Sequence, residues 1–165
     1  MLDIVIIGSG PAGLSAAIYG SRSGLDVLVI EKISHGIGQI AEADCINNYL
    51  GFSSIRGFEL GMQFRTHAEA CGVRFQESEA IKLEQTDACW KIYAKDGSCI
   101  QSKTVIYAAG ASHRHLNVFG EEALIGKGVS YCATCDGTFY KGKDVAVIGG
   151  GNTAVGDALY LSDLC

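Results

Sequence analysis

Two cysteines near the C-terminal end of the sequence are the residues best suited to carry chemistry. They stand three positions apart, at Cys132 and Cys135, directly before Asp136. Cysteines at this spacing can close a small disulfide ring and exchange it with another disulfide through thiolate attack. Such motifs commonly have a lowered thiol pKa, and a neighbouring carboxylate can move protons during the exchange. The pattern predicts thiol–disulfide chemistry carried by Cys132, Cys135 and Asp136.

The sequence leaves two other interpretations of the cysteine pair open, a zinc site and a pair of inert, buried cysteines. A zinc site requires four ligands, and the sequence offers no second C-x-x-C or H-x₃₋₅-H pair. The nearby histidines, His113 and His115, have an unusual spacing for zinc. The pair can also be two inert, buried cysteines. We expect no metal site.

The total of seven cysteines bears on the compartment. Their number is odd, their spacing is irregular, and they include only one C-x-x-C pair. Secreted disulfide scaffolds have a denser and even-numbered framework. The cysteine pattern therefore favours a reducing, cytoplasmic setting.

A glycine-rich run near the N-terminus is typical of a dinucleotide-binding turn. Gly8–Gly13 matches G-x-G-x-x-G between an apolar run and a helical pattern. The first glycine makes the tight turn, the second lets the backbone approach a pyrophosphate, and the third allows close packing of helix on strand. Glu31 ends the next apolar run, where a carboxylate can accept hydrogen bonds from a ribose. The alternative is a purely structural turn with a solvated glutamate.

A second glycine cluster repeats this theme. Gly149–Ala154 has the G-x-G-x-x-A form and follows another apolar run. The acidic residue or arginine that completes such a site should lie roughly 20 residues further on. That position is past Cys165, so the sequence begins a second nucleotide site without finishing it.

The residues around these motifs indicate the elements that position them. Apolar runs ending in glycine are typical of strands buried on both faces, and proline suits the first turn of a helix. A strand, a helix and a strand within about 30 residues form a βαβ unit with parallel strands. We expect strands at 2–7, 25–30, 73–75, 90–94, 99–101, 103–109 and 143–148, helices at 56–71 and beginning at residues 11 and 152, a loop at 33–55 and a connector at 111–130.

Composition excludes several classes of protein. The 165 residues include 22 glycines and one proline, are 48% apolar and carry a formal charge of −5. The apolar content rules out disorder, and the acidic balance argues against a nucleic-acid or anionic-membrane partner. The longest apolar run is far shorter than the ~20 residues that span a bilayer. By length the chain is one domain, or one domain and part of a second.

Two dinucleotide-type motifs on either side of a C-A-T-C-D run resemble the N-terminal half of the bacterial-type, low-molecular-weight thioredoxin reductases. These enzymes are FAD-dependent pyridine nucleotide–disulfide oxidoreductases. The resemblance covers essentially the whole chain. Its strongest points are GSGPAG at 8–13, CATCDG at 132–137 and VAVIGGGNTAV at 145–155.

The resemblance implies an α/β fold with two Rossmann-like parts. Residues 1–112 would be the first segment of a three-layer ββα FAD-binding domain, and residues 113–165 the beginning of an NADP-binding domain that carries the redox motif. The implied FAD-binding residues are Gly8, Ser9, Gly10, Pro11, Ala12, Gly13, Glu31, Lys32, Gly38, Gln39, Asn48, Ala80 and Gly110. The implied residues of the incomplete NADP site are Gly149, Gly151, Asn152, Thr153 and Ala154.

The resemblance also implies a reaction. Electrons would pass from NADPH to FAD, to the Cys132–Cys135 pair, and to thioredoxin or a similar small dithiol protein. Cys135 would face the flavin, Cys132 would attack the substrate disulfide, and Asp136 would be the acid. The full-length enzyme is expected to be a homodimer.

The sequence lacks the family's returning flavin-binding segment and its basic NADP-phosphate site. We therefore expect a truncated chain that is inactive alone. The alternative is an FAD-binding fragment, or a relative with a different electron donor or partner and no thioredoxin reductase activity.

Overall fold

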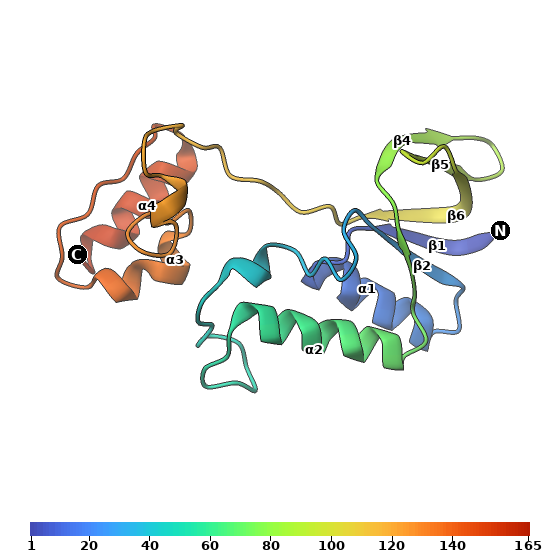
Figure 1. Ribbon diagram of the computed structural model, residues 1–165, viewed down its shortest axis with the longest axis horizontal. Helices are drawn as coiled ribbons and strands as arrows, with labels where there is room; N and C mark the ends of the chain where they lie inside the picture. Colours follow the sequence, from blue (N-terminus) through green and yellow to red (C-terminus); the bar gives the residue numbers. More distant parts are fainter. The chain divides into compact units, whose positions relative to one another are not determined.

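The computed structural model describes residues 1–165, which fall into two compact units (Figure 1). Unit 1 comprises Met1–Ala111 and unit 2 comprises Ser112–Cys165. Unit 1 contains a six-stranded sheet and two long helices, whereas unit 2 is helical and contains no strand. No helix in either unit has the length and apolar character needed to cross a bilayer.

The sheet of unit 1 has the strand order β3-β2-β1-β6-β5-β4. Its parallel part consists of β1 (Leu2–Ile7), β2 (Val27–Glu31), β3 (Arg74–Glu77) and the second half of β6 (Cys99–Tyr107). β1 lies between β2 and β6, and its residues Val5 and Ile6 are fully buried. The expected βαβ unit is confirmed, although its second strand begins two residues later and ends one residue later than predicted.

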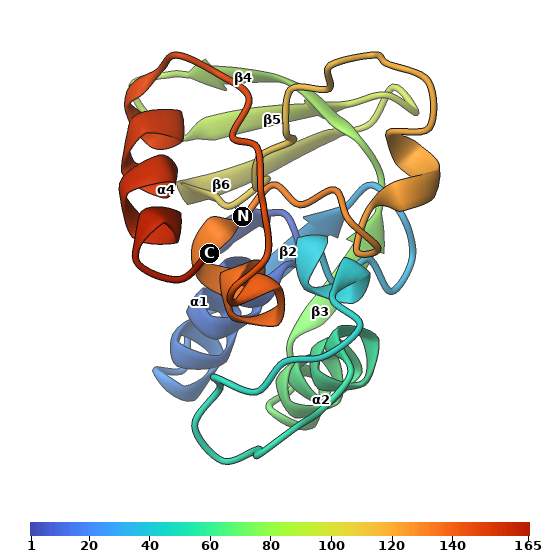
Figure 2. The same cartoon turned by 90° about the vertical axis from the view of Figure 1, so that its left-hand side faces the viewer.

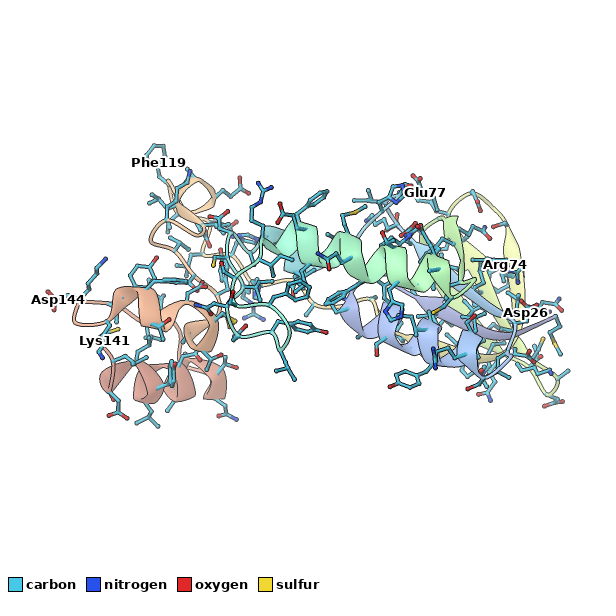
Figure 3. The ribbon with its side chains drawn as sticks, turned by 90° about the horizontal axis from the view of Figure 1, so that it is seen from below. Asp26, Arg74, Glu77, Phe119, Lys141 and Asp144 are labelled. Carbon is cyan, nitrogen blue, oxygen red and sulfur yellow. A yellow bond between two sulfur atoms is a disulfide. The ribbon has the colours of Figure 1, made fainter.

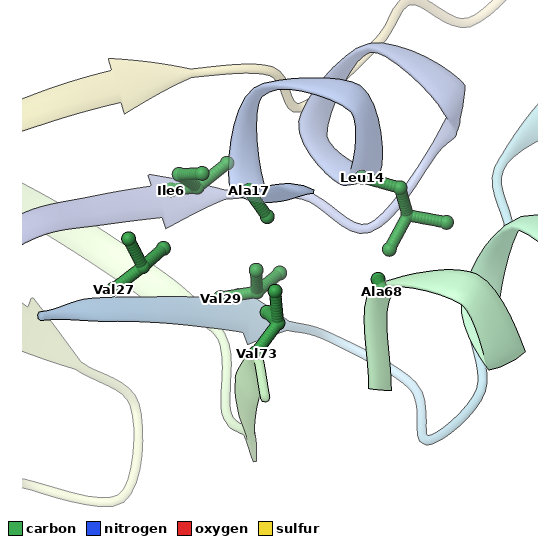
Figure 4. Close-up of a cluster of buried hydrophobic side chains, with 7 residues drawn as sticks. All are labelled: Ile6, Leu14, Ala17, Val27, Val29, Ala68 and Val73. Atoms are coloured by element: carbon green, nitrogen blue, oxygen red, sulfur yellow. The ribbon is translucent and has the colours of Figure 1, made fainter. Parts of the chain in front are cut away.

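Two helices cover one face of the parallel strands, as Figures 1 and 2 show. They are α1 (Pro11–Arg22) and α2 (Gly57–Ala70). Fully burying one aliphatic side chain of this interface contributes about 2 kcal/mol, so the layer is a main source of stability. The buried side chains are Ile6, Leu14, Ala17, Val27, Val29, Ala68 and Val73 (Figure 4).

An antiparallel meander covers the opposite face. It consists of β4 (Ala80–Gln85), β5 (Trp90–Ala94) and the first half of β6, with the expected turn at 95–98. Ile92 of β5 is fully buried against Val5 and Ile7 of β1 and against β2. Helices, parallel strands and meander form three layers, which confirms the expected ββα fold class.

β6 differs from the sequence prediction. Instead of two strands at 99–101 and 103–109, one strand pairs with β5 up to Ser102 and with β1 from Ser102 onward. Ser102 is fully buried and donates a hydrogen bond to the carbonyl oxygen of Thr104 at 2.7 Å. The expectation of a buried strand at 103–109 is wrong, because the strand ends at Tyr107 and most of its residues after Ser102 are exposed, Tyr107 by 72%. This half also has a strand neighbour on one edge only.

The expected loop at 33–55 contains two short ordered features. A 3₁₀ turn, η1 (Gln39–Glu42), lies near its middle, and a single antiparallel bridge joins Ile46 to Ile55. The bridge closes the loop immediately before α2 begins at Gly57. Isolated pairing of this kind has no periodic sequence signal, so the sequence predicts only a loop.

Unit 2 contains η2 (Glu122–Leu124), α3 (Ala133–Asp136), η3 (Gly137–Tyr140) and α4 (Asn152–Ser162). The predicted strand at 143–148 is absent, and all of these residues are exposed. Figure 3 shows Lys141 and Asp144 on the outside of the unit. A strand requires a neighbour for its backbone N–H and C=O groups, and unit 2 contains no strand to supply one.

Candidate functional site

The first glycine turn connects β1 to α1, and close backbone contacts set its shape. Gly8 has a φ of +108°, and a Cβ there would lie 2.2 Å from the carbonyl oxygen of Ala108. A Cβ at Gly13 would lie 1.9 Å from the carbonyl oxygen of Gly8. Any larger residue at these two positions would collide with backbone. The packing of α1 on β1 therefore requires Gly13, and the close approach of the segment after β6 requires Gly8.

Gly10 is different, because no protein atom crowds it. A Cβ at this position would be 3.8 Å from its nearest neighbour, the Cα of Gly38, which is an ordinary contact. Gly10 is the N-cap of α1, followed by Pro11, and the helix has neither a side-chain cap nor an acidic residue in its first turn. Such an end presents free N–H groups and positive potential to an anion. The turn, which includes Ser9 and Ala12, therefore fits a pyrophosphate.

The segment 36–39 lies against this turn. Ser9 is 5% exposed and its hydroxyl donates a hydrogen bond to the carbonyl oxygen of Gly36. Gly38 has a φ of +75°, and a Cβ there would lie 3.0 Å from the backbone of the turn. Gln39 donates from Nε2 to the carbonyl oxygen of Ala111 at 2.6 Å. The contacts of Ser9 and Gly38 bring these two predicted FAD residues together with Gly10. Gln39 instead contacts the residue that follows Gly110, another predicted FAD residue.

Glu31 lies at the end of β2, next to the turn. The carbonyl oxygen of the preceding residue, Ile30, accepts a hydrogen bond from the Gly8 amide at 2.9 Å. Glu31 is 4% exposed, and its Oε2 accepts a hydrogen bond from Arg65 Nη1 at 2.7 Å. The alternative of a solvated glutamate is therefore wrong. Sequence reasoning missed Arg65, because arginine on a helix is usually exposed.

The other predicted FAD residues lie around the edge of unit 1. Lys32 pairs with Glu79 at 2.8 Å, directly before Ala80, which begins β4. The two lysines at 32 and 95 hold the pKa of Glu79 below its usual value through hydrogen bonds and charge. Asn48 is exposed on the loop that the bridge closes, and Gly110 is exposed with a φ of +73°. The structure brings Lys32 and Ala80 together through Glu79.

The redox pair lies at the beginning of α3 in unit 2. A disulfide joins Cys132 and Cys135, whose Cα atoms are 5.3 Å apart. Cys132 is the N-cap of α3, and its sulfur accepts a hydrogen bond from the Cys135 amide at 3.2 Å. Cys132 is half-buried and Cys135 is exposed. The interpretation as two inert, buried cysteines is wrong.

Ser130 connects the predicted acid to the redox pair. Its hydroxyl donates to Asp136 Oδ2 at 2.5 Å and accepts from the Cys132 amide at 3.1 Å. The Asp136 amide in turn donates to the Cys132 carbonyl oxygen at 3.1 Å. Asp136 is therefore held at the same turn as the disulfide, as the sequence predicts. Ser130 itself gives no sequence signal, since a serine is common in any loop.

A buried carboxylate fixes the chain that enters the redox motif. Glu121 is 5% exposed and accepts hydrogen bonds from the Leu116 amide at 2.9 Å, the Asn117 amide at 2.7 Å and the Tyr131 hydroxyl at 2.6 Å. The Tyr131 hydroxyl and these amides lower the pKa of Glu121. Glu121 in return raises the pKa of Tyr131 to about 12, because it stabilises the protonated phenol.

The two histidines considered as zinc ligands lie on Tyr131 instead. The ring of His113 stacks on the Tyr131 ring at 4.6 Å between centroids, and His115 Nδ1 lies 3.2 Å from the tyrosine hydroxyl. No group of three or more His, Cys, Asp or Glu side chains is arranged to hold a metal ion in residues 1–165. Because both cysteines of the pair are disulfide-bonded, the zinc interpretation gains no support.

The second glycine turn precedes α4. Gly149 has a φ of +142°, and no atom lies within 4 Å of a Cβ built at Gly151. Gly151 is the N-cap of α4, which has no side-chain cap and no acidic residue in its first turn. Asn152, Thr153 and Ala154 form that first turn. This open helix end is chemically suited to a phosphate.

Comparison with known proteins places these features in a context. A family model described as pyridine nucleotide-disulphide oxidoreductase matches residues 2–165. The thioredoxin reductase of Mycoplasma genitalium is 42% identical over 162 residues, which are 98% of this chain and 51% of that protein. The chain thus spans about half the length of the curated relatives it matches.

Two solved structures are similar to the chain over nearly its whole length. The crystal structure of thioredoxin reductase from Streptococcus pyogenes is 41% identical with a TM-score of 0.92, over 99% of this chain and 53% of that one. A ferredoxin-flavin thioredoxin reductase from Clostridium acetobutylicum is 36% identical with a TM-score of 0.62, over 99% of this chain and 56% of that one.

Proposed function

Because the chain belongs to the pyridine nucleotide-disulphide oxidoreductase family, we propose that it forms the N-terminal part of a flavoprotein disulfide reductase. The reductase passes electrons from NADPH through FAD and the Cys132–Cys135 pair to thioredoxin or a similar small dithiol protein. The observation that carries this proposal is an accessible disulfide at a helix start, with a carboxylate held at the same turn.

Unit 1, which ends at Ala111, makes up all but the last residue of the proposed first segment of the FAD-binding domain, residues 1–112. The uncrowded backbone at Gly10 and the open end of α1 receive the pyrophosphate, and Glu31 receives the adenosine ribose. Gly38, Gln39 and Asn48 line the path toward the flavin, as the family resemblance implies. When bound, FAD supplies two-electron transfer between a nicotinamide and a disulfide.

Unit 2, which begins at Ser112, contains the proposed beginning of the NADP-binding domain, residues 113–165. The second glycine turn and Asn152–Ala154 hold part of the NADPH phosphate chain at the open end of α4. The residues that would complete this site are expected in the half of the relatives that the chain does not match.

The cysteines carry the exchange with the partner. Reduction of the Cys132–Cys135 disulfide by two electrons and two protons gives two thiols. The Cys132 thiolate attacks the partner's disulfide, forms a mixed disulfide and displaces the partner's other sulfur as a thiolate. The Cys135 thiolate then attacks the Cys132 sulfur, which restores the disulfide and releases the reduced partner. Asp136, held by Ser130, accepts the proton of the attacking thiol and donates a proton to the displaced thiolate of the partner.

The proposed setting is the cytoplasm, and the proposed assembly of the whole enzyme is a homodimer. The five cysteines outside the redox pair are free thiols, which favours a reducing compartment. A dithiol that reduces a partner protein becomes a disulfide, so a reductant in the same compartment must reduce it again.

A single-turnover experiment tests the cysteine roles without any cofactor. The chain is reduced with dithiothreitol, freed of reductant and mixed with oxidised thioredoxin. Cys135→Ser should trap a covalent mixed disulfide through Cys132, visible by non-reducing electrophoresis. Cys132→Ser should trap none, and Cys89→Ser, which removes a free cysteine of unit 1, should react as the wild type. Equal trapping by Cys132→Ser and Cys135→Ser would contradict the assignment.

Flavin binding by unit 1 is tested separately. The chain is mixed with FAD and the retained flavin is read from its visible absorbance. Gly10→Val should abolish flavin retention while the circular dichroism spectrum stays unchanged. The valine side chain would occupy the space proposed for the pyrophosphate without colliding with protein atoms. Gly150→Val, in the second turn, is the matched control and should retain flavin. Absence of flavin on the wild-type chain would contradict FAD binding by this unit.

A second candidate function follows from the likeness to a ferredoxin-flavin thioredoxin reductase. In that case the same disulfide receives electrons through FAD from an iron–sulfur protein instead of NADPH. Reduction of thioredoxin by the full-length protein, measured with NADPH or with reduced ferredoxin as sole donor, separates the two. Activity with ferredoxin alone would favour this second candidate.

A further inference from the structure

A buried ion pair lies beside the first glycine turn, at Arg65 of α2 and Glu31 of β2. Arg65 Nη1 lies 2.7 Å from Glu31 Oε2, and the two side chains are 6% and 3% exposed. Arg65 Nε donates to Glu69 Oε1 at 2.7 Å, and the guanidinium carbon lies 3.4 Å from the centroid of the Phe75 ring. Three contacts from different elements therefore fix the plane of this guanidinium.

Packing alone does not explain this pair. Taking two charges out of water is costly, and apolar residues of similar volume are often as stabilising or more so. Arg65 faces the sheet from the otherwise apolar side of α2, where Leu60 and Ala68 are fully buried. Burial opposes its charge, but the hydrogen bonds that Arg65 donates to Glu31 and Glu69 outweigh that effect and raise its pKa. A structural role would not require a charge here.

An exposed pair in the same unit provides the contrast. Arg74 of β3 pairs with Asp26, and both side chains are more than half exposed (Figure 3). Exposed pairs of this kind contribute little to stability. Arg74 is therefore a matched control for Arg65.

We propose that Arg65 is a positioning residue for the adenosine ribose of the flavin nucleotide. This inference rests on the proposed FAD site. The arginine occupies Oε2 of Glu31 and fixes the carboxylate, so that Oε1 is the oxygen that accepts the ribose hydroxyls. Glu31 is suitably placed, because the residue before it is hydrogen-bonded to the Gly8 amide of the glycine turn. The planar guanidinium of arginine fixes the orientation of the Glu31 carboxylate better than lysine would, because the lysine ammonium is a point charge on a flexible chain.

The test measures binding of ADP, which carries the adenosine diphosphate half of FAD, to the full chain by calorimetry. The paired probe is 2′,3′-dideoxyadenosine diphosphate, which lacks the hydroxyls that Glu31 would bind. Wild type should bind ADP more tightly than the dideoxy probe. Arg65→Met should weaken ADP binding roughly ten- to hundredfold, as expected for losing a fixed, charged acceptor. It should leave the affinity for the dideoxy probe unchanged, and Arg74→Met should change neither affinity.

Arg65→Lys keeps the experiment decisive if Arg65→Met fails to fold. The lysine retains the charge but not the planar fork, so ADP binding should weaken less, again with no change for the dideoxy probe. An equal loss for both probes in either variant would overturn the inference, because a distorted site does not distinguish them. Equal wild-type affinity for both probes would overturn it while leaving FAD binding intact. A wild-type chain that binds neither ADP nor FAD would overturn the flavin site and this inference together.

Discussion

Two glycine turns of similar sequence have different surroundings. The turn at Gly8–Gly13 follows β1, which pairs with β2 on one side and β6 on the other. The turn at Gly149–Ala154 follows residues 144–148, which form no strand and are exposed. Each turn leads into a helix that begins on a glycine without a side-chain cap. The same glycine pattern thus follows a paired strand of a sheet in unit 1 and an unpaired segment in unit 2.

The difference shows what glycine spacing specifies. At Gly13 a Cβ would meet a carbonyl oxygen at 1.9 Å, whereas at Gly150 and Gly151 no atom lies within 4 Å. In the first turn, neighbouring strands hold β1 so close to α1 that only glycine fits. In the second, only Gly149 is in a conformation that favours glycine, with a φ of +142° and a Cβ position 3.0 Å from the Ala154 side chain, whereas Gly150 and Gly151 are uncrowded. Glycine spacing permits a phosphate-binding turn, and the sheet gives the turn its position.

Amide hydrogen exchange should show the largest contrast between the two regions. Amides of β1 are buried and hydrogen-bonded, so they should exchange only when a large part of unit 1 opens. Amides at 144–148 have no strand partner and should exchange roughly a thousandfold faster or more. Mass spectrometry of peptic fragments measures both. Slow exchange at 144–148 would show that these amides are hydrogen-bonded, and the difference in exchange rate between the two regions would disappear.

Alanine substitution should separate the turns by stability. Gly13→Ala gains about 1 kcal/mol of helix propensity, but the collision with Gly8 should cost more, so we expect a net loss of about 3 kcal/mol. Gly150→Ala should change the free energy of unfolding by less than about 0.5 kcal/mol. Urea denaturation followed by circular dichroism gives both values. Comparable losses for the two variants would mean that the second turn is also tightly packed.

A tyrosine titration should test the hydrogen bond between Tyr131 and Glu121 in unit 2. The pKa of Tyr131 is raised to about 12 by its hydrogen bond to Glu121. Since the folded value lies above the unfolded one, the stabilisation is present below about pH 10 and is lost as the pH rises toward 12. Ultraviolet absorbance after a rapid pH jump should show one of the seven tyrosines titrating late.

The matched variant for this titration is Glu121→Gln. It replaces the carboxylate whose hydrogen bond and charge raise the pKa of Tyr131, so the late titration should move back toward pH 10. Glu121 also predicts behaviour in acid. Because its own pKa is lowered, its contribution to stability is present above about pH 4.5 and is lost as the pH falls below that value. An unshifted tyrosine titration in Glu121→Gln would refute the interaction.

Local patterns predicted much of unit 1 and the redox motif. The run β1–α1–β2 follows from apolar periodicity and glycine spacing, and these signals lie within about 30 residues. The C-x-x-C pair is equally local, and its disulfide closes across two intervening residues. Such features depend on neighbours in the chain, which a single sequence displays.

Features that depend on distant partners could not be predicted. Arg65 meets Glu31 across 34 residues, and its burial depends on how α2 lies on the sheet. Glu121 becomes a buried acceptor only because the loop before it folds back. The strand at 143–148 was predicted from apolar residues alone, although a strand also needs a neighbour. In each case the missing information was the identity of a remote partner.

The contact that closes the first glycine turn comes from far along the chain. Gly8 lies against the carbonyl oxygen of Ala108, and β1 receives its second neighbour only from residues 102–107 of β6. During synthesis on a ribosome, β1 emerges early, but its open edge stays unpaired until Tyr107 has left the exit tunnel. An unpaired apolar strand edge is a template for association with other chains. The earliest turn to be translated is thus completed only once the last strand of unit 1 has been made.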